Sequence, residues 1–407
     1  MIYAIENANL LDTATGEIVP DQRIVIEQGQ IMEVGERGRL PSDAAIISAA
    51  GKVVMPGLCD AHVHVTAFTA DFALLGRTAP TFVAAKASEI LHDMLMRGFT
   101  TVRDAGGADH GIARAVREGL FTGPDLLFCG KAISQSGGHG DMRLAGEYQH
   151  GGYDCCAGLG RVCDGVPEIR KGCRDAVRQG AHHIKLMVSG GVSSPTDRIS
   201  STQLSEDELK AAVEEAEAAE IYCMAHAYTP RAIERAVADG VRSIEHGNLL
   251  DREAAAKIKK HGAFLVPTLV TYDSLAREGA ACGLSSAMQR KIKDVLDAGR
   301  QAFELAVQDG LKIAFGTDLL GPMHKDQMIE FAIRGESQGA ADVIRSATLN
   351  FAELVGREGQ IGTIAPGADA DILIVDGNPL DSLEILQRPA QNLFLIMKKG
   401  KLIKSLI

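Results

Sequence analysis

The strongest constraint on the fold is a repeat in the middle of the chain, where short apolar segments alternate with stretches of helical periodicity. One helical stretch is SEDELKAAVEEA at 205–216, in which Ser205 and Glu208 form a capping box ahead of an Ala/Glu-rich helix. Eight such βα units in roughly 290 residues fit a closed (β/α)8 barrel better than an open doubly wound sheet, because a typical barrel takes about 250 residues. The expected strands end near residues 62–64, 104, 134, 185–189, 226, 246, 268–271 and 318.

The two ends of the chain have a different pattern, with alternating strands and tight turns. The first end holds RIVIE at 23–27 and QIMEV at 30–34, and the last holds DILIV at 371–375 and LFLIM at 393–397. Each end is too short to form a sandwich alone, so we expect the two to pair. The expected fold class is α/β: a TIM barrel over residues 56–359, with a small discontinuous β-sandwich domain made by residues 1–55 and 360–407.

Composition excludes several classes of protein. The chain of 407 residues is 46% hydrophobic and 23% charged, which is typical of a soluble globular protein. Its net charge is −11 and no dense basic tract occurs, so we expect neither nucleic acid nor a membrane as a partner. The N-terminus lacks the features of a signal peptide, and the eight cysteines, including the adjacent Cys155 and Cys156, form no disulfide-scaffold pattern. We therefore expect a cytoplasmic protein.

Two imidazoles stand one residue apart at the end of the first apolar strand. They are His62 and His64, in LCDAHVH at 58–64. Side chains two apart on a strand share a face, so both rings can reach one metal ion. Taken alone the pair also fits a chance occurrence, because the chain has 12 histidines.

Three more candidate ligands end separate apolar strands: His226, His246 and Asp318. The carboxyl ends of barrel strands converge on one cavity, where ligands from distant sequence positions meet. Any one of the three is more often a core or rim residue than a ligand. Five such side chains in register, on strands one, five, six and eight, are hard to explain by chance, and they predict a metal centre.

Lys185 lies in the apolar strand HIKLM at 183–187, where a charged amine is costly to bury. One interpretation is a lysine whose ammonium reaches past the strand end into water. The other is that burial lowers its pKa and the neutral amine takes up carbon dioxide, which makes a carbamate able to bridge two cations. Two divalent ions with the carbamate, Asp318 and a hydroxide would give a net charge of about +1, which favours an anionic substrate and a developing oxyanion.

This set of residues resembles the amidohydrolase superfamily with a binuclear metal centre, over nearly the whole chain. PGLCDAHVH at 56–64 is similar to the superfamily's strand-one signature, and APGADADI at 365–372 to its C-terminal segment. The resemblance implies two divalent metal ions, with zinc expected, although imidazole and carboxylate ligands also accept manganese, cobalt or iron. It implies that His62, His64 and Asp318 bind one ion, that His226 and His246 bind the other, and that N6-carboxylated Lys185 binds both.

Further strings resemble the prolidase-type branch, which includes Xaa-Pro dipeptidases, Xaa-Arg/Lys carboxypeptidase-like dipeptidases and ochratoxin-hydrolysing amidohydrolases. Members of that branch release a C-terminal amino acid from an amide. Imidazolonepropionase is a more distant relative that shares the barrel. The strings are FTTVRDAGG at 99–107, SGGHGD at 136–141, IKLMVSGGVSSPTD at 184–197, AHAYTP at 225–230, IEHGN at 244–248 and FGTDLL at 315–320.

The resemblance implies a reaction and a set of roles. A metal-bridging hydroxide attacks the amide that joins an acyl or aminoacyl group to a C-terminal amino acid with a free carboxylate. Asp318 and His246 are the implied catalytic residues, with Asp318 as general acid and base. His139 and Tyr228 match positions that hold the substrate carboxylate or the scissile carbonyl. Alternatively, His139 bonds only to backbone and Tyr228 only packs in the wall.

Several readings of function stay open at this point. Our first choice is a prolidase-like dipeptidase, and the alternative is an N-acyl amino acid amidase such as an ochratoxin A hydrolase. An imidazolonepropionase-like cyclic amide hydrolase and a non-catalytic assembly protein rank lower. No GxSxG elbow supports a serine hydrolase, and we expect Arg103 and Asp104 to form a structural ion pair. Relatives of this type commonly form homo-oligomers, often octamers, so a homo-oligomer is expected here.

Overall fold

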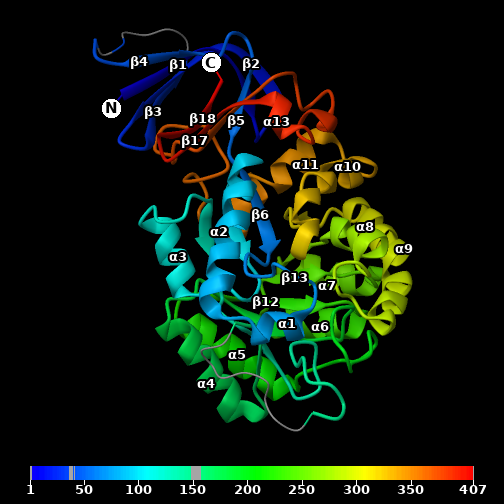
Figure 1. Ribbon diagram of the computed structural model, residues 1–407. Coiled ribbons are helices and arrows are strands. Elements are labelled where there is room, and N and C mark those ends of the chain that lie inside the picture. Colours follow the sequence, from blue (N-terminus) through cyan, green and yellow to red (C-terminus); the bar gives the residue numbers. More distant parts are fainter. Residues whose placement is uncertain (1, 36–39, 41, 148–156, 407) are drawn as a thin grey trace. The chain divides into compact units, whose positions relative to one another are not determined.

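The computed structural model describes residues 2–35, 40, 42–147 and 157–406 (Figure 1). The chain divides into two compact units. One comprises Met1–Asp60, His92–Thr101 and Phe331–Ile407, and the other comprises Ala61–Leu91 and Val102–Glu330. The expected domain borders at residues 56 and 359 stay a prediction, because compactness alone does not define a folding domain.

The first unit contains a mixed sheet that joins the two ends of the chain. Its strand order is β18-β17-β16-β5-β1-β2-β3, and β4 also pairs with β1. The N-terminal and C-terminal segments meet where β5 runs antiparallel to β16, with Pro56 opposite Ile372. Apolar side chains such as Ile5, Ile24 and Leu395 are fully buried in its core. The strands are β1 (Ile2–Asp12), β2 (Glu17–Glu27), β3 (Gln30–Gly35), β4 (Ala45–Ser48), β5 (Val53–Pro56), β16 (Ile372–Val375), β17 (Leu393–Lys398) and β18 (Lys401–Ser405).

The second unit is built on the parallel strands of a TIM barrel, which confirms the expected fold class. The wall consists of a sheet in the order β10-β9-β11-β12-β13-β14-β15 and a second sheet in the order β6-β7-β8. The ring closes where Ala61 N donates to Phe315 O at 2.7 Å and Asp318 N donates to His62 O at 2.8 Å. The strands are β6 (Leu58–Val63), β7 (Phe99–Asp104), β8 (Asp125–Leu127), β9 (Ala132–Ser134), β10 (Gly160–Val162), β11 (His183–Met187), β12 (Tyr222–Ala227), β13 (Ser243–His246), β14 (Phe264–Val266) and β15 (Lys312–Ile313).

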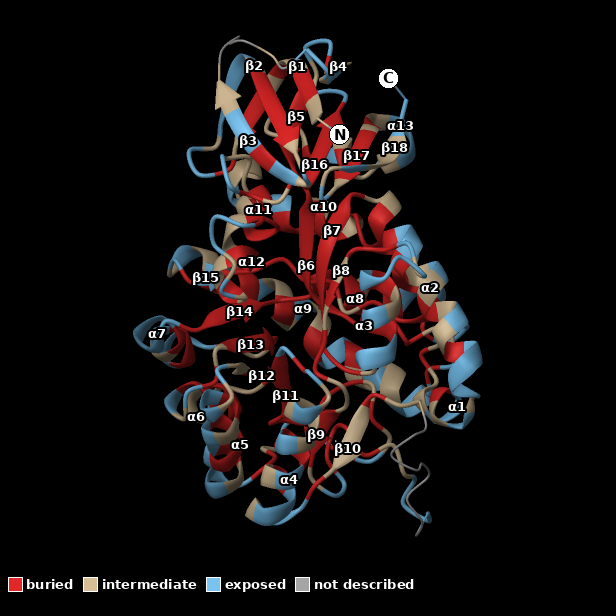
Figure 2. Cartoon of the chain, turned by 90° about the vertical axis from the view of Figure 1, so that its left-hand side faces the viewer, coloured by how far each residue is buried: buried red, intermediate tan, exposed pale blue. Residues whose placement is uncertain are grey.

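Helices follow the barrel strands and cover them. Figure 2 shows β11 to β14 buried and the outer faces of α4 to α7 exposed. Ser205 and Glu208 form the expected capping box, which starts α5 with Leu209 and Val213 on its buried face. The helices are α1 (Phe72–Arg77), α2 (Pro80–Met96), α3 (His110–Arg117), α4 (Gly165–Arg178), α5 (Glu206–Ala218), α6 (Pro230–Ala238), α7 (Arg252–His261), α8 (Leu269–Glu278), α9 (Ser286–Gln308), α10 (Ile329–Gly335), α11 (Ala340–Ser346), α12 (Leu349–Leu354) and α13 (Pro389–Asn392), with 3-10 turns η1 (Gly321–Asp326) and η2 (Leu383–Ile385).

Most expected strand ends agree with the structure, but the last two strands are shorter than expected. β14 ends at Val266, because Pro267 has no N–H to continue a ladder. β15 ends at Ile313, so Asp318 lies beyond the strand on a connecting segment. The expected third strand is split into β8 and β9, and β10 pairs with β9 as an additional strand.

Two further expectations concern the whole chain. Among the described residues, no helix combines the length and the apolar character that crossing a membrane would require. No disulfide joins the cysteines that the structure describes, which are Cys59, Cys129, Cys163, Cys173, Cys223 and Cys282. Cys155 and Cys156 lie outside the described residues.

Candidate metal centre

The histidines of the first strand and the aspartate after the last strand lie together. Asp318 Oδ1 is 3.4 Å from His62 Nε2 and 3.2 Å from His64 Nε2. One donor atom from each of His62, His246 and Asp318 falls within 4.8 Å of the others. Nitrogen and oxygen donors at these separations can converge on one divalent ion.

The other expected histidines extend this group. The ring centroids of His62 and His246 are 4.9 Å apart, and those of His226 and His246 are 4.7 Å apart. Burial holds the pKa of both His226 and His246 well below the usual value, which favours the neutral imidazole that binds metal. The barrel therefore brings all four expected histidines to one place.

Lys185 lies inside the barrel wall on β11 and is 2% exposed. Burial lowers the pKa of its amine, although Glu245 and Asp318 act in the opposite direction. A lowered pKa favours the neutral amine, the form that can react with carbon dioxide. The expected alternative of an ammonium reaching solvent does not fit a side chain buried this deeply.

Glu245, which was not predicted from the sequence as a site residue, accepts a hydrogen bond from His62 Nδ1. Its carboxylate lies 2.7 Å from His62 Nδ1 and accepts hydrogen bonds from Arg103 at 2.9 Å and Ser243 at 2.6 Å. With Nδ1–H donating to Glu245, His62 presents Nε2 to a metal. Burial would raise the pKa of Glu245, but Arg103 and His62 hold it well below the usual value. Its position next to His246, an expected ligand, was the available signal.

The ion pair expected between Arg103 and Asp104 is wrong. Arg103 pairs with Glu245, and both side chains are fully buried. The Asp104 carboxylate instead accepts the backbone N–H groups of Val65, Gly106 and Ala108. Two neighbours on a strand point to opposite faces, so adjacent charges in the sequence need not meet.

The remaining imidazoles are also oriented by hydrogen bonds. His64 Nδ1 lies 2.8 Å from Gly106 O, and His246 Nδ1 lies 2.8 Å from Thr268 Oγ1. These two rings, like His62, are left with Nε2 for a metal. His226 is turned the other way, since its Nε2 lies 3.1 Å from Gly190 O.

Three residues of this site have a strained backbone. The φ angles of His246, Thr268 and Asp318 are 74°, 44° and 53°, all in the left-handed region. Such a conformation costs about 1–3 kcal/mol per residue and is uncommon for a β-branched threonine. Each follows or ends a strand, so the strain aims side chains at the centre rather than relieving a turn.

The two expected substrate contacts, His139 and Tyr228, border the histidine group. The His139 ring stacks on His226 with centroids 4.1 Å apart, and the Tyr228 ring lies 4.7 Å from that of His226. The Nδ1 atom of His139 lies 2.9 Å from Ser194 Oγ and 3.4 Å from Asp197 Oδ2.

A lysine from α9 secures the loop that carries these partners. Lys291 Nζ donates to Gly191 O at 2.9 Å, to Ser194 O at 3.0 Å and to Asp197 Oδ1 at 3.1 Å. Sequence reasoning missed both Lys291 and Asp197, because their contact joins segments far apart in the chain. The sequence also predicts that the segments 139–165 and 189–204 line the specificity pocket, and residues 148–156 of the first segment lie outside the described residues.

Known proteins match this chain over most of its length. A family model described as "Amidohydrolase family" matches residues 53–405. The ochratoxinase of Aspergillus niger is 31% identical over 418 residues, which cover 98% of this chain and 86% of that protein.

Similar solved structures extend over the entire chain. The crystal structure of a prolidase complexed with N-methylphosphonate-L-proline is 45% identical, covers 100% of both chains and has a TM-score of 0.96. A Xaa-Pro dipeptidase with bound methionine in the active site is 26% identical, with 100% coverage of both chains and a TM-score of 0.88.

Proposed function

The chain belongs to the amidohydrolase family, and from this premise we propose that it is a prolidase-like hydrolase that releases a C-terminal amino acid with a free carboxylate from an amide. The observation that carries the proposal is the gathering of His62, His226, His246 and Asp318 beside His139 and Tyr228. Metal-ligating groups and groups able to hold a carboxylate or carbonyl thereby share one site.

The donor set suits a pair of divalent cations. We propose that His62, His64 and Asp318 hold one ion, that His226 and His246 hold the other, and that carboxylated Lys185 bridges them. Burial holds the pKa of His226 and His246 well below the usual value, which favours the neutral imidazole, and Glu245 hydrogen-bonds His62 Nδ1. Bound divalent cations supply Lewis acidity that polarises the scissile carbonyl and lowers the pKa of water.

Asp318 is the proposed proton carrier. Burial would raise its pKa, but His62 and His64 hold the pKa well below the usual value, so its carboxylate is ionised at neutral pH. It can then accept the proton of the attacking water and pass it to the leaving nitrogen. His246, at 4.0 Å from Asp318 Oδ2, lies beside this step as the second proposed catalytic residue.

His139 and Tyr228 are the proposed contacts of the substrate's carboxylate or scissile carbonyl. Asp197 and Ser194 orient the His139 ring from one side, and His226 packs on its face. The net charge of −11 does not attract an anion, so the attraction for a free carboxylate must be local.

A second candidate is an N-acyl amino acid amidase. The similarity to ochratoxinase, over 98% of the chain, favours this alternative. The match to imidazolonepropionase of Vibrio cholerae spans only 48 residues, or 12% of the chain, and supports that activity weakly. We also propose a homo-oligomer, up to an octamer, which light scattering after size-exclusion chromatography measures directly.

Release of free amino acid from Xaa-Pro, Xaa-Arg, Xaa-Phe and N-aroyl-Phe substrates tests the proposal. The expected result is highest activity on a dipeptide, lost on chelation and restored by added zinc. Highest activity on the N-aroyl compound would favour the amidase instead. A zinc-loaded protein that cleaves none of the four contradicts the proposal, and a protein that binds no divalent ion would favour an assembly role.

A further inference from the structure

A line of hydroxyl groups connects the imidazole of His246 to the phenol of Tyr228. His246 Nδ1 lies 2.8 Å from Thr268 Oγ1, and Tyr272 Oη donates to Tyr228 Oη at 2.8 Å. Burial raises the pKa of Tyr272, and a hydrogen bond from Thr268 acts in the opposite direction, which links the two pairs. The three hydroxyl residues are at most 3% exposed, so water does not compete for these bonds. We refer to Thr268, Tyr272 and Tyr228 as the hydroxyl chain.

The hydroxyl of Thr268 bonds to His246 and does not form the helix cap that its position would allow. It stands at the N-cap of α8, where a threonine hydroxyl normally accepts a backbone N–H, yet its side chain makes no cap bond. The buried carboxylate of Glu330 takes the N–H of Val270 instead, at 2.6 Å. With its left-handed φ of 44°, Thr268 turns the hydroxyl away from the helix and toward His246.

The number of protons on these groups determines which group donates in each hydrogen bond of the hydroxyl chain. A histidine that ligates metal through Nε2 donates its Nδ1–H, here to Thr268. Thr268 has one proton, which then goes to Tyr272, and the proton of Tyr272 goes to Tyr228. The oxygen of Tyr228 therefore accepts from Tyr272, and its own proton is left to be donated outward.

We propose that Thr268 and Tyr272 are positioning residues that make Tyr228 a hydrogen-bond donor to the substrate when His246 ligates metal. If the donor and acceptor of each hydrogen bond were exchanged, Tyr228 would donate its proton to Tyr272 and not to the substrate. Metal ligation and substrate recognition are thereby coupled through side chains that touch neither the metal nor the substrate. The nature of the acceptor, a carboxylate or carbonyl oxygen, rests on the proposed function.

The test compares Thr268→Val, which keeps the shape and removes the hydroxyl, with Thr268→Ser, which keeps the hydroxyl. Zinc affinity is measured by competition with a chelator. We expect Thr268→Val to weaken zinc binding about tenfold or more, the usual effect of losing a partner behind a ligand, and Thr268→Ser to stay near the wild type. Equal effects of the two variants would overturn the link to His246.

The second half of the test uses Tyr272→Phe, Tyr228→Phe and the double variant with a cleavable Xaa-Pro dipeptide. Each single variant should lower kcat/KM about five- to tenfold, consistent with the loss of one hydrogen bond. The double variant should be no worse than Tyr228→Phe, because Tyr272 acts through Tyr228. Effects that multiply would show independent roles and refute the proposal.

The zinc measurement needs no turnover, which separates two kinds of failure. If no dipeptide is cleaved but Thr268→Val alone loses zinc affinity, the proposed function is wrong while the link from His246 to Thr268 stands. In that case calorimetry with L-proline as the probe replaces kcat/KM. An equal heat of binding for Tyr228→Phe and the wild type would then refute the proposed donor role of Tyr228.

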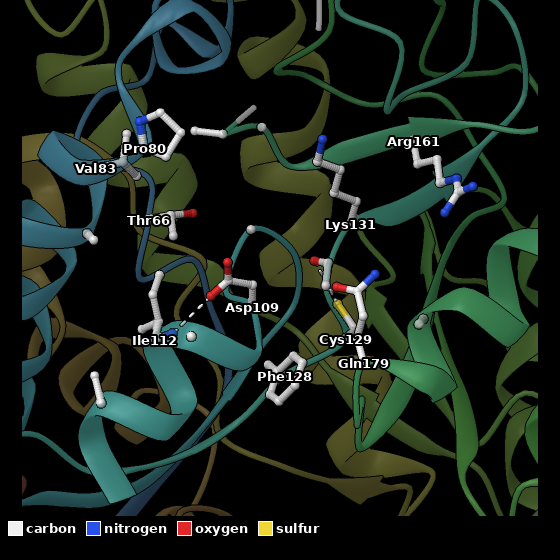
Figure 3. A pocket seen from close by; sticks show the side chains of 18 of the residues that line it. Thr66, Pro80, Val83, Asp109, Ile112, Phe128, Cys129, Lys131, Arg161 and Gln179 are labelled. Atoms are coloured by element: carbon white, nitrogen blue, oxygen red, sulfur yellow. Dashed lines mark hydrogen bonds between the residues drawn. The ribbon is translucent and has the colours of Figure 1, made fainter. Parts of the chain in front are cut away.

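A second inference rests on a separate cavity of about 590 Å³ (Figure 3). Its lining includes none of the proposed metal ligands or substrate contacts. It is lined by residues 128–131, which connect β8 to β9, and by residues of α3 and α4. Within the described chain, the hydroxyl of Thr66 has no hydrogen-bond partner although the residue is 2% exposed. In Figure 3 this hydroxyl points into the cavity.

The lining defines the chemistry of an occupant. Val83, Ile112 and Phe128 supply an apolar wall, while Asp109 and Lys131 bring one charge of each sign to the same space. Asp109 Oδ1 also accepts the N–H of Ile112, and the remaining charged pair of the lining, Arg161 and Asp175, forms an ion pair at 2.9 Å. A compact ligand complementary to this lining has an apolar body, a cation, an anion and an acceptor or donor for Thr66. We infer that the cavity binds an apolar α-amino acid as its zwitterion.

Fluorine NMR tests this with 4-fluoro-L-phenylalanine as the probe and with chelated enzyme, so that the metal centre does not contribute. Thr66→Val should weaken binding about threefold or more, as expected for one hydrogen bond. Thr101→Val is the matched control, because Thr101 is also buried without a partner but lies outside the cavity. Equal affinities of the wild type, Thr66→Val and Thr101→Val, or equal binding of 4-fluorophenylacetate, which lacks the cation, would overturn the inference.

Discussion

Replacing Glu245 by glutamine tests the support behind the metal centre most directly. The substitution preserves shape but removes the charge that accepts hydrogen bonds from Arg103 at 2.9 Å and faces His62 Nδ1 at 2.7 Å. Arg103 and Glu245 are both fully buried, so the arginine would keep an uncompensated charge inside the barrel. Breaking a buried pair in this way costs about 3–5 kcal/mol of unfolding free energy.

Urea denaturation of the metal-free protein at pH 7 measures this loss, and chelator competition measures zinc affinity. We expect unfolding free energy to fall by about 3–5 kcal/mol and zinc affinity to fall about 10- to 100-fold, because the amide offers one acceptor oxygen to the two donors Arg103 and His62. Glu206→Gln is the matched control, since its ion pair with Lys210 is exposed and should contribute little.

The effect also has a predicted pH dependence. The pKa of Glu245 is lower in the folded protein than in the unfolded chain, so its contribution is present above the unfolded pKa. It is lost as the pH falls through the folded pKa, and the difference between wild type and Glu245→Gln should therefore be constant from pH 6 to 8 and shrink in acid. A loss below about 1 kcal/mol with unchanged zinc affinity would refute the reasoning.

Three further predictions concern the centre and its loop. Asp318→Asn removes the proposed proton carrier and, measured with saturating zinc, should lower kcat about 10²- to 10⁴-fold; near-normal turnover would exclude Asp318 from the proton transfer. Lys185→Met removes the amine needed for a carbamate and should reduce bound zinc per chain, as measured by elemental analysis; an unchanged zinc content would contradict a bridging role. Lys291→Met removes three hydrogen bonds that secure Gly191, Ser194 and Asp197, so steady-state kinetics should show a larger change in KM than in kcat. A change confined to kcat would argue against a role in substrate positioning.

Much of the metal centre could be predicted from sequence because each proposed ligand marks a strand or its end. His62 and His64 share a face at the end of β6, and His246 ends β13. Parallel barrel strands deliver such positions to one mouth, so a linear pattern already implies proximity. Asp318 lies beside His62 and His64 although its strand ends earlier than expected, because a hydrogen bond from its N–H to His62 O holds the segment there.

The supporting residues could not be predicted in the same way. Glu245 and Arg103 meet across the barrel from separate strands, and Lys291 reaches the loop at 191–197 from α9. Thr268 has the local signature of a helix cap, yet a left-handed φ commits its hydroxyl to His246. None of these contacts has a fixed spacing along the chain, and local propensity pointed Thr268 to a different partner.

The order of apolar and polar residues along the chain was enough to determine the barrel and the side chains available to bind metal, because strand periodicity and barrel geometry are local and repeating. Only the tertiary structure decided which nitrogen of each imidazole faces inward, which charge balances Arg103 and which hydroxyl orients Tyr228. Those choices depend on contacts between segments separated by tens to hundreds of residues, and on burial that gives each hydrogen bond its strength.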